Sequence, residues 1–113
     1  MNQWDDWVGR SETRRDRVDD SAVARWLAAL DCNAPADGFV PQAYHWCLCL
    51  PDVPTAALGT DGHPLRDEAP TSLLPPVPLP RRMWAASKVV FHRPIRAGQT
   101  IIRKSRVASI TEK

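Results

Sequence analysis

The sequence lacks the features that mark membrane and secreted proteins. No apolar run approaches the roughly 20 residues that a membrane-spanning helix needs. The first ten residues, "MNQWDDWVGR", are acidic and aromatic, which is not the pattern of a secretory signal peptide. We therefore expect a cytoplasmic protein that does not associate with a membrane.

Cysteine is scarce, and its spacing argues against a metal centre. An odd number of cysteines in a chain without a signal peptide is typical of reduced thiols. In "HWCLC", which holds His45, Cys47 and Cys49, one residue separates the cysteines, whereas a zinc knuckle needs two or more. With Cys32 as the third cysteine and no second Cys/His pair, we predict buried thiols and no metal site.

Acidic residues are almost absent from the second half of the chain. Residues 1–68 carry six Lys/Arg against twelve Asp/Glu, a net charge of −6, whereas residues 69–113 carry nine against one, a net charge of +8. A basic surface of this kind favours an anionic partner, either a nucleic acid or the phosphate groups of a substrate or cofactor.

The chain does hold enough apolar residues for a packed core. Its 113 residues suit one small domain, and a hydrophobic content of 43% with five tryptophans is not that of a disordered chain. Asp20 and Ser21 are suitable caps for a helix that begins at Ala22. The apolar residues that follow have helical spacing: Val23, Trp26, Leu27 and Leu30.

Two segments near the C-terminus have the alternation of β-strands. These are "KVVFHRPI" (88–95) and "TIIRKSRVASI" (100–110), and the residues Arg96 to Gln99 between them contain a glycine. The pattern predicts an antiparallel hairpin. Upstream, we expect a short helix after Pro41 and a tight turn at Asp61-Gly62.

A proline-rich stretch, "LLPPVPLPRRMW" (73–84), has two interpretations. A ligand for an SH3 domain would place arginine where Pro80 stands, so the match to that motif is imperfect. Because prolines fix φ without needing a hydrogen-bond ladder, the stretch also suits a rigid wall that carries Arg81 and Arg82 into a cleft.

Several segments together resemble a known family. They are "LGTDGHP" (58–64), "LPPVPLPRRMWA" (74–85), "FHRPIRAGQ" (91–99) and "SRVASITEK" (105–113). These look like the N-terminal part of the MaoC-like acyl-CoA hydratases of the mesaconyl-C4-CoA (3-methylfumaryl-CoA) hydratase type, which are grouped with the FAS1-like and hydroxyacyl-thioester dehydratases.

The resemblance implies an α+β protein with a partial hotdog fold, an antiparallel sheet packed on a helix. Residues 1–113 would form the N-terminal hotdog domain, incomplete at its C-terminus. The implied reaction adds water to an unsaturated acyl-CoA thioester without a cofactor. Because related enzymes place the catalytic Asp and His in a later part, we expect this chain alone to be inactive. We also expect it to pair with a second hotdog half or as a homodimer.

Four residues are candidates for substrate binding. Arg81 and Arg82 can pair with a phosphate or with a substrate carboxylate. Alternatively, one of them can brace the fold against the acidic N-terminal half, through Asp16 or Asp20. Trp84 and His45 suit an acyl pocket, although both residue types are also common in cores. No catalytic residue is assigned, because "DCNAPAD" (31–37) only loosely echoes the Asp-x-Asn-Pro-x-His pattern of related hydratases and equally suits a helix end.

Two other functions follow from single features. The basic half suits a nucleic-acid-binding domain, but its strands lack interleaved aromatic residues apart from Phe91, so we expect no nucleic-acid partner. The prolines suit an interaction protein, which requires residues 73–82 to be mobile.

Overall fold

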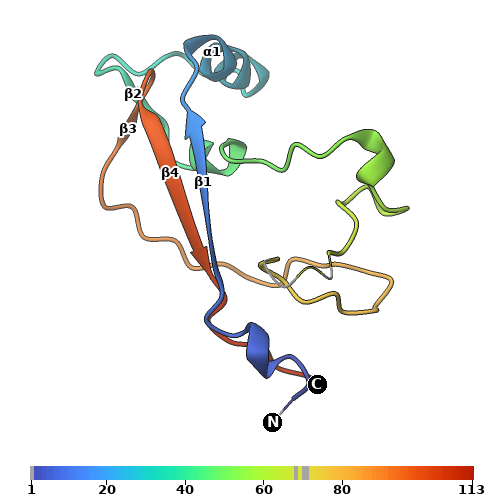
Figure 1. The fold of residues 1–113 in the computed structure, drawn as a ribbon. Helices are drawn as coiled ribbons and strands as arrows, with labels where there is room; N and C mark the ends of the chain where they lie inside the picture. Colours follow the sequence, from blue (N-terminus) through green and yellow to red (C-terminus); the bar gives the residue numbers. More distant parts are fainter. Residues whose placement is uncertain (1, 68, 70–71) are drawn as a thin grey trace. The chain divides into compact units, whose positions relative to one another are not determined.

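The computed structural model describes residues 2–67, 69 and 72–113. Its elements are one α-helix, three 3-10 helices and four strands. In chain order they are η1 (Asp5–Trp7), β1 (Ser11–Arg17), α1 (Asp20–Ala29), β2 (Phe39–Val40), η2 (Tyr44–Cys47), η3 (Thr55–Ala57), β3 (Ile95–Arg96) and β4 (Thr100–Arg106). The strands form two antiparallel pairs, β1 with β4 and β2 with β3 (Figure 1). This is an α+β arrangement consistent with a partial hotdog fold.

The long pair, β1 and β4, is bounded by main-chain hydrogen bonds. Beyond one end, the N–H of Val18 donates to the carbonyl of Gln99 at 2.9 Å, and the N–H of Gly98 donates to the carbonyl of Val18 at 2.7 Å. Gly98 has a φ of 88°, which a residue with a Cβ adopts only with strain. The turn predicted between Arg96 and Gln99 is therefore present.

The predicted hairpin is wrong in its pairing. Strand β4 forms as expected, but its partner is β1, and residues 88–94 form no strand. β3 is two residues long and pairs with β2, placing Val40 opposite Ile95. Strand β1 was not predicted because "SETRRDR" contains no apolar residue, so its alternating exposure is not accompanied by a hydrophobic periodicity.

Helix α1 follows the prediction with a shift at its start. Asp19 is the N-cap, and its side chain accepts from the N–H of Ser21 at 3.3 Å. Val23 and Leu27 on the apolar stripe are buried, whereas Leu30 is 54% exposed. After Pro41 the expected short helix appears as the single-turn η2.

The chain forms two compact units. The first unit comprises residues 1–13, 51–85 and 104–113, and the second unit comprises residues 14–50 and 86–103. The core lies in the second unit. Its buried members are Val18, Val23, Leu27, Val40, Tyr44, Leu48 and Cys49. Burying an aliphatic side chain of this size contributes roughly 1.5–3 kcal/mol, so this cluster dominates the stability of the second unit.

The first unit depends more on polar contacts. Val107 is its only buried residue among those described, and it is still 9% exposed. The terminal segments lie side by side, because the amide of Asn2 donates to the carbonyl of Ile110 at 2.9 Å (Figure 1). The guanidinium of Arg10 stacks over Trp7, 3.5 Å from the ring centroid. No helix in the described part of the chain is long and apolar enough to cross a membrane.

Candidate functional site

The segment "LGTDGHP" forms a tight loop in the first unit. The N–H of Gly59 donates to the carbonyl of His63 at 2.7 Å, and the N–H of Gly62 donates to the carbonyl of Gly59 at 3.0 Å. Leu58 and Pro64 form an isolated antiparallel bridge that closes the loop. Gly62 has a φ of 80°, which explains the glycine at this position. The turn predicted at Asp61-Gly62 is confirmed.

Arg82 clamps this loop. Its Nη2 donates to the carbonyl of Pro64 at 2.8 Å, and its Nε lies 3.7 Å from Oδ2 of Asp61. Asp61 also accepts from the main-chain N–H of His63 at 3.0 Å, and the imidazole of His63 lies 3.3 Å from its carboxylate. The N–H of His63 is the main cause of a lowered pKa of Asp61, and the charge of Arg82 acts in the same direction. Asp61 therefore holds its negative charge beside Arg82.

The proline-rich stretch folds against the same loop region. The N–H of Val77 donates to the carbonyl of Pro75 at 2.8 Å, and the N–H of Leu79 donates to the carbonyl of Val77 at 2.9 Å. The guanidinium of Arg66 donates to the carbonyl of Leu79. Short-range turns and an arginine contact therefore link the stretch to itself and to the loop region.

This wall borders a cleft of about 480 Å³ in the first unit. Apolar residues from 64–65 and 73–79 make up most of the lining, while Arg66, Arg81 and Arg82 add positive charge and Glu12 and Asp67 add negative charge. Arg81 is exposed and makes no hydrogen bond or ion pair with another described residue. The two adjacent arginines thus differ: Arg82 is committed to the loop, and Arg81 is available to a ligand. Trp84 is 81% exposed and does not line this cleft.

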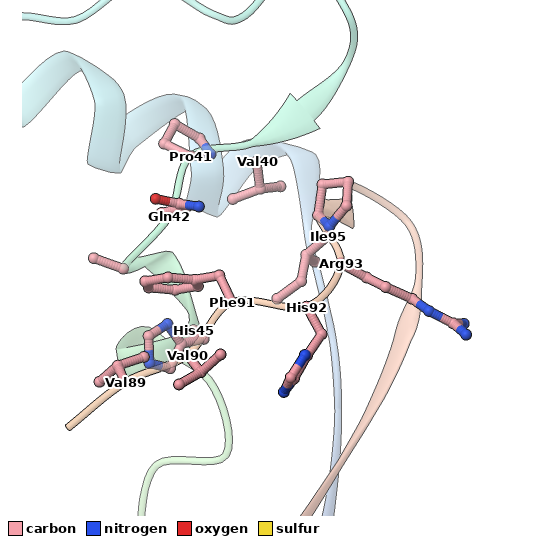
Figure 2. Close-up of a pocket in the computed structure, with 12 residues that line it drawn as sticks. Val40, Pro41, Gln42, His45, Val89, Val90, Phe91, His92, Arg93 and Ile95 are labelled. Atoms are coloured by element: carbon pink, nitrogen blue, oxygen red, sulfur yellow. The ribbon is translucent and has the colours of Figure 1, made fainter.

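A second cleft, of about 330 Å³, lies in the second unit around His45 (Figure 2). Residues 40–43 and His45 form one side, and residues 89–95 form the other. The ring of His45 packs edge-on against Phe91 with their centroids 5.5 Å apart, and also lies 4.8 Å from the ring of Trp46. Ala43 starts the η2 turn with a φ of 81°, a strained conformation for a residue with a Cβ.

The thiols only partly follow the prediction. Cys49 is buried, but Cys32 and Cys47 are exposed, and all three are free. Among the described residues, no group of three or more His, Cys, Asp or Glu side chains is arranged to hold a metal ion.

Asp16 is a structural contact that the sequence did not reveal. Its Oδ2 accepts from the main-chain N–H of Cys49 at 2.8 Å, across 33 residues of sequence. Cys49 has a φ of 57°, so this hydrogen bond supports a left-handed residue at the edge of the core. The N–H of Cys49, followed by that of Arg17, lowers the pKa of Asp16.

Sequence comparison identifies the group to which these features belong. The model of the family described as hydroxyacyl-thioester dehydratase type 2 matches residues 43–113. The chain belongs to this family. Its resemblance to the MaoC-like hydratases and dehydratases is confirmed, and the matched segment includes all four candidate residues, His45, Arg81, Arg82 and Trp84.

A curated relative is similar over nearly the whole chain. Mesaconyl-C4-CoA hydratase from Chloroflexus aurantiacus is 37% identical over 116 residues, which cover 97% of this chain and 39% of the relative. The chain therefore spans well under half the length of that enzyme. The segment containing Asp31 lies outside the family match, and Asp31 is exposed just after α1 with a φ of 57°.

Proposed function

We propose that this chain is the substrate-pocket part of an enoyl-CoA hydratase that adds water to an unsaturated acyl-CoA such as mesaconyl-C4-CoA. The observation that carries the proposal is the 37% identity to a mesaconyl-C4-CoA hydratase along 97% of the chain. In this proposal residues 1–113 are an N-terminal hotdog domain that another hotdog half completes, either in a longer polypeptide or in a homodimer. The unpaired cysteines are consistent with the reducing cytoplasm.

The reaction requires an acid and a base that neither cleft combines as a carboxylate and a histidine: the first is lined by Glu12 and Asp67, and the second by His45 and His92. A base must activate water for attack at C3, an acid must protonate C2, and donors must stabilise the enolate oxygen of the thioester. Asp61 and His63 form a carboxylate–imidazole pair, but the pair is tied to Arg82 and lines neither of the two clefts. We therefore assign the catalytic Asp and His to a part of the hydratase outside this chain.

The chain's own contribution is recognition of the substrate. A guanidinium offers a planar fork for a carboxylate or a phosphate, and Arg81 presents one beside an apolar cleft. Arg82 positions it by fixing the neighbouring backbone to the loop at Asp61 and Pro64. His45 borders the second cleft and is assigned to the acyl pocket. Trp84 lines neither cleft but is exposed next to the arginines in sequence, so it is assigned to the substrate surface around Arg81.

A chimera tests this function. The 113-residue chain replaces the matched segment of the Chloroflexus aurantiacus hydratase, and hydration of mesaconyl-C4-CoA is measured. We expect activity in the chimera and none in the 113-residue chain alone. Arg81→Ala should raise KM about tenfold or more, since it removes a charge-assisted hydrogen bond to the substrate, with little change in kcat.

Lys104→Ala is the matched control, because Lys104 is an exposed cation on β4 that lines neither cleft. It should leave KM unchanged. A folded chimera that hydrates no enoyl-CoA would reject the proposed function. An active chimera whose KM is insensitive to Arg81→Ala would reject the role of Arg81 alone.

A further inference from the structure

Residues 88–93 of the second unit have a strand-like sequence but no strand partner. They lie outside every helix and strand, and their main-chain groups form no hydrogen bond with another described residue. Their apolar side chains are well exposed, with Val89 at 40%, Val90 at 63% and Phe91 at 44%. β-branched and aromatic residues in this density are typical of a strand whose faces are covered.

The side chains of this segment lie on different sides of its backbone. Figure 2 shows the ring of Phe91 against His45, while the side chains of His92 and Arg93 extend away from that ring pair. Phe91 is therefore directed at His45, while His92 and Arg93 leave the ring pair on another side, although both also line the second cleft. A neighbouring strand would impose a regular alternation by pairing with the exposed N–H and carbonyl groups.

Charge argues against a second copy of the same segment as the partner. An antiparallel self-pair centred on Val90 would bring Lys88 and Arg93 of both copies, four positive charges, into one short strand pair. Like charges that face each other across strands are destabilising, whereas opposite charges stabilise the pair. The single acidic residue between positions 69 and 113 leaves this half of the chain with a net charge of +8, so an acidic strand is the favoured neighbour.

We propose that residues 88–93 are an edge strand that pairs with a β-strand bearing acidic side chains, supplied by the part of the hydratase outside this chain. The inference rests on the proposed function, because the relative has 61% of its length beyond the share that this chain covers, that is, 100% minus the matched 39%. Pairing would cover Val90 and hold Phe91 against His45, completing one wall of the second cleft.

Hydrogen exchange in the chimera described above tests the pairing independently of activity. In the isolated 113-residue chain, the amides of residues 88–93 should exchange as exposed groups do. In the chimera, alternate amides should slow by about 100-fold or more. Unchanged exchange in a chimera that hydrates mesaconyl-C4-CoA would overturn the pairing and leave the function standing. Slowed exchange in an inactive chimera would do the reverse.

A double proline variant tests whether the slowed exchange comes from pairing of residues 88–93. Val89→Pro/Val90→Pro removes two consecutive N–H groups, one of which must point toward any strand alongside, so the protection should disappear. Val53→Pro is the matched control, because Val53 is a similarly exposed valine (38%) in a loop of the first unit. Equal loss of protection in both variants would contradict the proposal.

If the chimera does not fold, two synthetic peptides test the same claim on the 113-residue chain. They have about nine residues, a common strand length, and alternate valine with glutamate or with lysine. The glutamate peptide should shift the amide resonances of residues 88–93, and the lysine peptide should not. Equal responses to both peptides, or none, would overturn the proposal. So would protection of these residues that rises with dimerisation of the chain by itself.

Discussion

In the second unit, seven apolar side chains from separate segments are buried together, whereas the described residues of the first unit bury only Val107. The first unit is held instead by guanidinium groups that donate to carbonyl oxygens, as Arg82 does to Pro64 and Arg10 to Ser72. The proline-rich stretch that borders its cleft needs few main-chain hydrogen bonds. The proposed ligand-binding surface thus lies in a unit held by proline and arginine, while the hydrophobic effect is concentrated in the other unit.

This contrast has a consequence for mutations. Loss of a buried methyl group removes transfer free energy and leaves a cavity, so it is felt throughout a cooperative core. Loss of one exposed polar contact releases a loop but lowers the free energy of unfolding only slightly. The two units should therefore respond differently to substitutions of the same chemical size.

The largest effect should come from truncation of the core. Leu27→Ala in α1, where Leu27 is 5% exposed, should lower the free energy of unfolding by about 3 kcal/mol. Leu65→Ala is the counterpart in the first unit, where Leu65 is 58% exposed, and should change it by less than about 0.5 kcal/mol. Urea unfolding followed by tryptophan fluorescence measures both. Similar losses in the two variants would remove the distinction between the units.

A smaller, pH-dependent effect should come from Asp16. Asp16→Ala removes the acceptor for the Cys49 N–H and should cost about 1 kcal/mol near neutral pH, since the carboxylate is only partly buried. Because the folded state lowers the pKa of Asp16 below the ordinary value of 3.8, its contribution is present above that value and is lost as the pH falls through the folded-state pKa.

Urea unfolding at pH 6 and below pH 3 measures this difference. The gap between the wild type and Asp16→Ala should shrink at the lower pH. Asp6→Ala, an exposed aspartate in η1, is the control and should show no such trend. A gap that stays constant with pH would show that the carboxylate charge does not support Cys49.

The smallest effect should be local to the first unit. Arg82→Ala removes the brace on the 58–64 loop, so the amides of Gly59 and Gly62 should exchange about fivefold faster, the equivalent of one lost hydrogen bond. Arg81→Ala should leave these rates unchanged, because Arg81 has no contact with the loop among the described residues. Hydrogen exchange measured by mass spectrometry separates the two. Equal acceleration in both variants would contradict the different roles assigned to the adjacent arginines.

Sequence alone located the elements whose signals are local. The helical spacing around Leu27, the alternation of β4 and the glycine turn at Asp61-Gly62 each lie within a few residues, and each was found. The predicted start of α1 was displaced because two aspartates and a serine, Asp19, Asp20 and Ser21, are adjacent there, and each of them is a suitable cap. The strand predicted at residues 88–95 was wrong because alternation shows that a segment suits a strand, but not that another strand lies beside it.

Tertiary structure decided what depended on distant partners. Strand β1 has no apolar residue, so only its hydrogen bonds with β4 make it a strand. The identity of Asp61 as the partner of Arg82, 21 residues along the chain, was likewise hidden, and the sequence offered other aspartates for that role. Family membership and local periodicity could be predicted from the sequence, because short stretches of neighbouring residues are enough to recognise them. Pairing and bracing are set by which backbone and charged groups meet after folding, because a hydrogen bond or ion pair acts only over a few ångströms.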